Sequence, residues 1–175
     1  MQIWALFLYK YNPRKEKRPF SISDMIGEMA NEDIYNLGIK ALITNRAGQI
    51  LLLQVNKQEL IDENRAYWDI PGGRVKHGES IEQTLTQEIA EETKLQLKEF
   101  KYFDSILSKI RIPQHPGDTV GVGLILFIYR CAIVDENAPI ALSREHSQYR
   151  WCTPAEASEL LRVKYPASFT SKLSF

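Results

Sequence analysis

The residues best suited to chemistry are glutamates in a segment that lacks basic side chains. From His77 to Thr93 the sequence holds five glutamates and no lysine or arginine. Glu88, Glu91 and Glu92 are spaced i, i+3 and i+4, so a helix would place them side by side. Carboxylate oxygens converging on one helix face suit a hard cation such as Mg²⁺. The alternative is a solvated acidic helix, or one paired with distant basic residues.

The apolar face of the same helix helps to decide between a metal site and a solvated acidic helix. At about 100° per residue, Ile81, Leu85 and Ile89 form one apolar face, and Glu88 and Glu92 fall within it rather than opposite it. Burying unpaired carboxylates costs free energy, so a compensating charge is expected. The pattern therefore favours a metal site over a plain surface helix.

A glycine turn, Pro71-Gly72-Gly73, comes just before the acidic segment. Glycine adopts backbone conformations that other residues avoid, and it lets the backbone approach a ligand closely. The carbonyl groups of this turn are candidate metal ligands, and an ordinary strand-ending turn is the alternative. The combination of the turn with the glutamates favours the functional interpretation.

The elements that must position these residues follow from turn and cap signals. Residues 37–44 and 49–55 are strand-like and flank the turn signal Asn45-Arg-Ala-Gly48, which predicts a β-hairpin. Ser80 and Gln83 form a capping-box pattern, which predicts a helix over 80–93. Further elements are expected as a short strand at 66–70, strands near 97–108, 120–134 and 148–152, and a helix after Thr153-Pro154.

Length and composition limit the class of protein. The 175 residues suit one domain. Lys plus Arg and Asp plus Glu each number 22, so the chain has no global field to attract long nucleic acid. The two cysteines form no CxxC pair, which predicts reduced, partly buried thiols in a cytoplasmic protein. His77, His115 and His146 lie in polar loops and are expected on the surface.

We expect residues 1–35 to form an extension in front of a main domain at 36–175. The apolar run at 1–9 is too short to span a bilayer and lacks the flanks of a signal peptide, so no membrane partner is expected. It is predicted to be a strand, followed by a basic loop at 10–19 and a short helix within 21–30. The strand would complete the chain's own sheet or, alternatively, form a homodimer interface.

The acidic segment and its turn resemble the Nudix box. Gly73, five residues, Glu79, seven residues and then Gln87-Glu88-Ile89-Ala90-Glu91-Glu92 follow the spacing of that motif of 23 residues. Trp68-Asp-Ile-Pro-Gly-Gly73 is similar to the strand and turn that usually precede it. The order of strands from about 37 to 161 is also similar to a Nudix domain. The resemblance implies an α/β fold, a Nudix-type α/β/α sandwich with a mixed β-sheet.

The resemblance also implies roles for individual residues. Glu88, Glu92 and, directly or through water, Glu91 correspond to metal ligands, and the carbonyl of Gly72 corresponds to a backbone ligand. Glu79 corresponds to the glutamate that orients the helix and supports the metal shell. The general base varies among Nudix proteins, and Glu88 and Glu145 are the candidates. A plain loop carboxylate is the alternative for Glu145.

The implied activity is hydrolysis of a phosphoanhydride bond, dependent on Mg²⁺ with Mn²⁺ as a substitute. The substrate would be a small nucleoside diphosphate derivative, such as a nucleoside triphosphate, ADP-ribose or a nucleotide sugar. We expect Tyr67, Trp68 and Gly73 at this substrate, where an aromatic ring can stack on a base. Core packing is the alternative for Trp68. Loops 56–67 and 110–118 are the expected contact regions.

Two residues depart from the family pattern. Gln87 stands where the family has an arginine that pairs with a box glutamate, and a neutral amide supports that geometry less strongly. This departure keeps open the alternative of a Nudix fold that binds a nucleotide derivative without hydrolysing it. Lys94 stands where the family has a glycine. A left-handed cap with a side chain costs on the order of 1 kcal/mol, so a different helix end is predicted.

Overall fold

The computed structural model describes residues 33–56, 67–108, 111–113 and 121–174. The predicted strand, basic loop and short helix of the first 30 residues lie outside this set. The elements are, in order, β1 (Tyr35–Ile43), β2 (Ile50–Val55), β3 (Trp68–Asp69), α3 (Ile81–Thr93), β4 (Leu97–Leu107), β5 (Gly123–Ile133), β6 (His146–Cys152), α4 (Pro154–Leu161), α5 (Ala167–Thr170) and the 3-10 helix η2 (Ser171–Leu173).

The strands form two three-stranded sheets, in the orders β1-β5-β4 and β3-β2-β6. β1 runs parallel to β5, whereas β4 runs antiparallel to it. β2 runs antiparallel to both of its neighbours. The first sheet is therefore mixed, as predicted.

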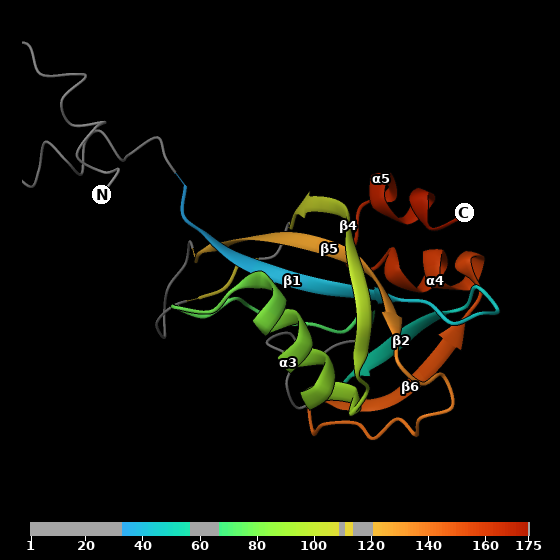
Figure 1. The fold of residues 1–175 in the computed structure, drawn as a ribbon. Coiled ribbons are helices and arrows are strands. Elements are labelled where there is room, and N and C mark those ends of the chain that lie inside the picture. The colour runs from blue at the N-terminus through green and yellow to red at the C-terminus, as the bar shows by residue number, and fades with distance from the viewer. Residues whose placement is uncertain (1–32, 57–66, 109–110, 114–120, 175) are drawn as a thin grey trace, which may run out of the picture. The chain divides into compact units, whose positions relative to one another are not determined.

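Helices cover the strands on two sides, as Figure 1 shows with α3 on one side and α4 and α5 on the other. Successive side chains of a strand point to opposite faces of the sheet. The strands therefore contribute residues to two apolar clusters. The α3 cluster includes Ile39, Ala41, Ile43, Leu51, Leu53, Leu85 and Ile89. The α4–α5 cluster includes Leu42, Ile50, Leu52, Ala157, Leu161, Tyr165 and Phe169. This layering confirms the α/β/α sandwich.

The predicted hairpin is wrong in its pairing, although its turn is present. Gly48 N–H donates to the Asn45 carbonyl at 2.9 Å, which closes the turn. β1 nevertheless pairs with β5, and only an isolated bridge at Thr44 and Ile50 joins it to β2. The physical reason is that both edges of β1 are occupied, one by β5 and the other by the backbone of residues 71–75.

Both ends of α3 are defined by hydrogen bonds. The Ser80 hydroxyl accepts from Gln83 N–H at 3.1 Å, and Gln83 Oε1 accepts from Ser80 N–H at 2.9 Å, so the predicted capping box is confirmed. At the other end Lys94 adopts a left-handed conformation with φ 62°. The prediction of a different helix end is therefore wrong. The next residue, Leu95, is buried, and its N–H donates to Thr93 Oγ1 at 3.2 Å, which favours the reversal of the chain despite the side chain.

The other strands and helices predicted for the described residues agree with the structure within a few residues, including α4 with its cap at Thr153. Cys131 and Cys152 are unpaired and buried, as predicted. Burial raises the pKa of the Cys131 thiol to about 12. No helix in the described part of the chain is long and apolar enough to cross a membrane.

Candidate active site

The glycine turn is hydrogen-bonded along the edge of β1 that does not pair with β5. Ile39 N–H donates to the Gly73 carbonyl, and Ala41 N–H donates to the Pro71 carbonyl, both at 2.8 Å. Gly72 lies between them with φ +128°, and a Cβ there would lie 2.2 Å from the Ile39 carbonyl oxygen. Only glycine fits this position, and its two neighbouring carbonyl groups are held by the hydrogen bonds to β1.

Glu88 fills the space that Gly73 leaves open. A Cβ on Gly73 would lie 2.4 Å from Cδ of Glu88 and 2.5 Å from each of its carboxylate oxygens. The Glu88 side chain is half-buried. Burial, followed by repulsion from Glu91, raises the pKa of Glu88. The structure thus places the Glu88 carboxyl group against the glycine turn.

Glu92 lies deeper and is bonded to the same turn. It is 6% exposed, and its Oε2 accepts from Gly72 N–H at 2.8 Å. Burial raises the pKa of Glu92 to about 7, and the Lys40 ammonium and the Gly72 N–H reduce that rise only in part. A carboxylate in this position is short of positive charge, as the apolar face of the helix predicted.

His146 borders Glu92 and corrects one prediction. Its side chain is 7% exposed rather than on the surface, and its Nε2 lies 3.8 Å from Glu92 Oε1. Burial lowers the pKa of His146 to about 4, so the ring is neutral near pH 7 and the contact is not an ion pair. The imidazole is buried because His146 starts β6 and pairs with Val55 of β2, a nonlocal contact that a polar sequence context does not reveal.

Glu91 on α3 and Glu79 in the loop before it both accept hydrogen bonds from neighbouring protein groups. Glu91 is exposed, and its Oε1 accepts from Gln87 Nε2 at 2.8 Å. Glu79 Oε2 accepts from Lys76 N–H at 3.1 Å and from Thr84 Oγ1 at 3.0 Å, and these bonds lower the pKa of Glu79. Glu79 therefore ties the loop before α3 to its first turn, which suits an orienting role.

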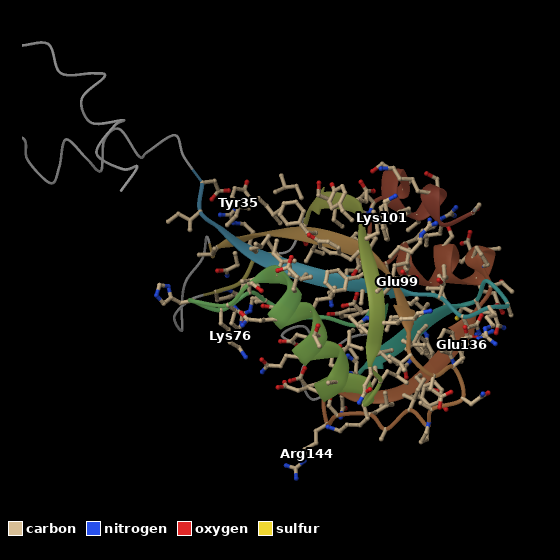
Figure 2. All side chains as sticks on the ribbon, viewed as in Figure 1. Tyr35, Lys76, Glu99, Lys101, Glu136 and Arg144 are labelled. Carbon is tan, nitrogen blue, oxygen red and sulfur yellow. The ribbon has the colours of Figure 1, made fainter. Side chains whose placement is uncertain are left out.

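The negative charge of Glu145 acts on Glu88. It is exposed in the loop before β6, and its charge contributes to the raised pKa of Glu88. Its backbone carbonyl accepts from Asn56 N–H at 2.7 Å, which anchors the loop. The neighbouring Arg144 side chain points away from the fold in Figure 2. The structure thus brings the second base candidate to the same side as the first.

A buried polar network beneath the turn was missed by the sequence analysis. Lys40 Nζ donates to Asp69 Oδ2 at 2.9 Å, and Asp69 also accepts from Lys164 Nζ and the Tyr165 hydroxyl. Burial alone would raise the pKa of Asp69, but Lys164 and Lys40 outweigh it and hold that pKa well below its usual range. The sequence feature that could have indicated this network is Lys40, a lysine inside an otherwise apolar strand.

The predicted substrate contacts lie beside this network. Tyr67 is half-buried, and Lys164 Nζ lies 5.3 Å from the centroid of its ring. Trp68 is partly buried and packs against the α4–α5 cluster, as the core-packing alternative proposed. Most of the two expected contact loops, 56–67 and 110–118, falls outside the described residues, which omit 57–66, 110 and 114–118 of these loops.

The residues fit a divalent cation in type and position. Among the residues that the structure describes, no three carboxylate, imidazole or thiol groups form a ready-made metal cluster. Glu91 is bonded to Gln87, and Glu92 is bonded to Gly72. Nevertheless, Glu88 and Glu92 meet at one turn, Glu91 neighbours Glu88, and the charge of Glu92 is incompletely compensated. Hard oxygen donors in this arrangement suit Mg²⁺ or Mn²⁺.

The layering of helices and strands, the glycine turn beside β1 and the glutamate-bearing helix α3 are the features that the Nudix resemblance implies. The model of the NUDIX domain family matches residues 35–173. The chain therefore belongs to the Nudix family, whose members generally use a divalent metal ion.

Named relatives extend this result. The chain is 35% identical over 83 residues to a putative 8-oxo-dGTP diphosphatase of Bacillus subtilis (strain 168), covering 47% of this chain and 46% of the relative, about half its length. It is 30% identical over 122 residues to the asymmetrical bis(5'-nucleosyl)-tetraphosphatase of Mus musculus, covering 69% and 74%. The solved MutT protein of Methanosarcina mazei Go1 is 25% identical, with a TM-score of 0.56 and coverage of 81% and 92%.

Proposed function

We propose that this chain is a Mg²⁺-dependent hydrolase of a phosphoanhydride bond in a nucleoside diphosphate linked to another moiety. The observation that carries the proposal is the convergence of Glu88 and Glu92 on the Gly72–Gly73 turn. The names of the two relatives, a diphosphatase and a tetraphosphatase of nucleotides, support the substrate class. Residues 36–175 would form the catalytic domain and residues 1–35 an extension.

The glutamates have two proposed roles, metal binding and proton transfer. Glu88, Glu91 and Glu92 would hold Mg²⁺ or Mn²⁺. When bound, such an ion neutralises charge on the phosphates and lowers the pKa of a ligated water. Glu88 is the first candidate for the base that takes a proton from the attacking water, because its raised pKa favours proton uptake. Glu145 is the second candidate.

A binding module without turnover is the second candidate function. Gln87 favours it, because its neutral amide bonds to the Glu91 carboxylate at 2.8 Å and supports that carboxylate less strongly than the arginine of the family pattern would. A nucleotide derivative would then be bound near Tyr67 and Gly73 but not cleaved.

Release of phosphate or nucleotide tests both functions. The panel would contain nucleoside triphosphates, ADP-ribose, nucleotide sugars and dinucleoside polyphosphates, each with Mg²⁺ and with EDTA. Turnover that requires Mg²⁺ supports the hydrolase and names its substrate class. Calorimetric binding of a nucleotide without turnover would favour the binding module, and Gln87→Arg would then test whether the missing arginine is the cause.

Gly73→Ala tests whether the position of Glu88 matters. The new Cβ would displace the Glu88 carboxyl, whose atoms lie within 2.5 Å of that point. Moving a flexible side chain costs on the order of 1 kcal/mol, whereas a misplacement of about 1 Å lowers turnover by about 10²-fold. We therefore expect a folded protein with turnover lowered by about that factor, as measured by steady-state kinetics and urea unfolding.

Gly48→Ala is the matched control. Gly48 lies in the turn after β1 with φ +72°, and a Cβ there would meet no atom within 4 Å. The substitution should cost about 1 kcal/mol of stability through backbone strain and leave turnover unchanged. Wild-type turnover in Gly73→Ala would contradict the assigned position of Glu88.

A further inference from the structure

The Lys40 ammonium has all three of its N–H donors occupied. Nζ lies 2.9 Å from Asp69 Oδ2, 3.0 Å from the Ile70 carbonyl oxygen and 2.9 Å from the Gly72 carbonyl oxygen. An ammonium group has three donors and no acceptor, so this set satisfies it completely. Lys40 is 8% exposed, and a charge buried this far is retained only when it is paired. The Lys40 ammonium is therefore a buried, fully hydrogen-bonded part of the turn.

Gly72 joins Lys40 to the acidic helix. Its carbonyl accepts from Lys40 Nζ at 2.9 Å, while its N–H donates to Glu92 Oε2 at 2.8 Å. The two polar groups of one residue thus bond to a cation on one side and to a carboxylate on the other. The Gly72 carbonyl is also the group that the Nudix resemblance assigns to the metal. The Lys40 ammonium therefore already occupies one side of the Gly72 carbonyl oxygen.

The side chains buried around the turn include two acidic and two basic groups. In the described part of the chain, the acidic members are Asp69 and Glu92 and the basic members are Lys40 and Lys164. Lys164 is bonded to Asp69, which leaves Lys40 as the cation that also bonds to the turn beside Glu92. A divalent ion bound at the glutamates would be repelled by the Lys40 ammonium, because like charges interact strongly where water is excluded.

We propose that Lys40 is the resident cation of the glycine turn. It holds the Gly72 carbonyl and offsets the acidic charge in the metal-free protein, and it thereby competes with the divalent cation and weakens its binding. Lys40 is a positioning residue in this role, since it acts through Gly72 and Glu92. The inference rests on the divalent-metal part of the proposed function.

Binding of Mn²⁺ to the full chain, without nucleotide, tests this role by titration with electron paramagnetic resonance. Lys40→Met frees the Gly72 carbonyl and removes the repelling charge. We expect its Kd for Mn²⁺ to fall by about tenfold or more, because a like charge beside the site is removed. Lys40→Arg keeps the charge and should bind Mn²⁺ as the wild type does. Lys101→Met removes an exposed charge on β4 (Figure 2) and should change nothing.

Thermal unfolding in EDTA and in Mn²⁺ supplies a second readout. Lys40→Met should melt below the wild type in EDTA, and Mn²⁺ should raise its Tm by more than it raises that of the wild type, because tighter binding stabilises the folded state more. If Lys40→Met fails to fold under both conditions, Lys40→Gln, which keeps a donor without the charge, carries the same expectation.

Three outcomes would overturn the proposal. Weaker Mn²⁺ binding by the folded neutral variant would mean that Lys40 assists the metal instead of competing with it. Equal binding by the neutral variant and the wild type would remove the competition and leave the proposed hydrolase standing. Absence of Mn²⁺ binding in every protein, including the wild type, would overturn both the competition and the metal dependence on which it rests.

Discussion

We expect Glu88→Gln to lower turnover of the best substrate by about 10²–10⁴-fold, the range for loss of a general base, with no loss of stability. The substitution removes both a metal ligand and a proton acceptor while keeping the size of the side chain. Burial and repulsion from Glu91 already disfavour the charged form of Glu88, so a neutral amide costs the fold little. Steady-state kinetics and urea unfolding measure the two effects separately.

Glu82→Gln is the matched control for this variant. Glu82 lies in the first turn of the same helix and is exposed, so its amide should leave both turnover and stability near wild type. Retention of activity in Glu88→Gln within about threefold, far below the loss expected for a general base, would refute the role of Glu88.

Glu145→Gln distinguishes the two base candidates. If Glu145 takes the proton, its amide variant should lose turnover while binding Mn²⁺ normally, because its carboxylate is not among the proposed ligands. If Glu88 is the base, Glu145→Gln should change turnover only modestly, through the weaker electrostatic effect of Glu145 on Glu88. A large loss in Glu145→Gln would therefore move the base role to the loop before β6.

The local parts of the site were predictable because their determinants lie close together in the sequence. The Ser80–Gln83 capping box set the start of α3, and helical periodicity then placed Glu88 and Glu92 at the border of the core. The observed burial of Glu92 follows from the same periodicity. Residues spaced by three or four on a helix are neighbours regardless of the rest of the fold, which is why this part of the prediction needed no tertiary information.

The nonlocal parts were not predictable in the same way. β1 was expected to pair with β2, yet its partner β5 lies about 90 residues away, a register fixed by the tertiary fold. Lys40 and Lys164 both bond to Asp69, from sequence separations of 29 and 95 residues. A single lysine in an apolar strand gives no sign of which carboxylate it will meet, so the network beneath the turn appears only in the structure.

That network predicts the largest effect on stability. Asp69→Asn would leave Lys40 and Lys164 without their shared carboxylate, and both lysine side chains are only 11% exposed. Breaking a buried ion pair by removing one partner costs about 3–5 kcal/mol, and we expect a loss of that size in the free energy of unfolding at pH 7. Asp104→Asn is the control, since its partner Lys172 is 51% exposed and such pairs contribute less than about 1 kcal/mol.

The pH dependence of this loss identifies its cause. The folded-state pKa of Asp69 lies below its ordinary value, so its charge stabilises the fold above the unfolded-state pKa of about 4, and that stabilisation declines as pH falls toward the folded-state pKa. The difference in unfolding free energy between wild type and Asp69→Asn should therefore shrink as the pH falls below about 4. A difference that stays the same down to about pH 3, well inside the window where the charge contribution should decline, would mean that the amide variant loses stability through packing or hydrogen bonding. The carboxylate charge of Asp69 would then not be what holds Lys40 at the turn.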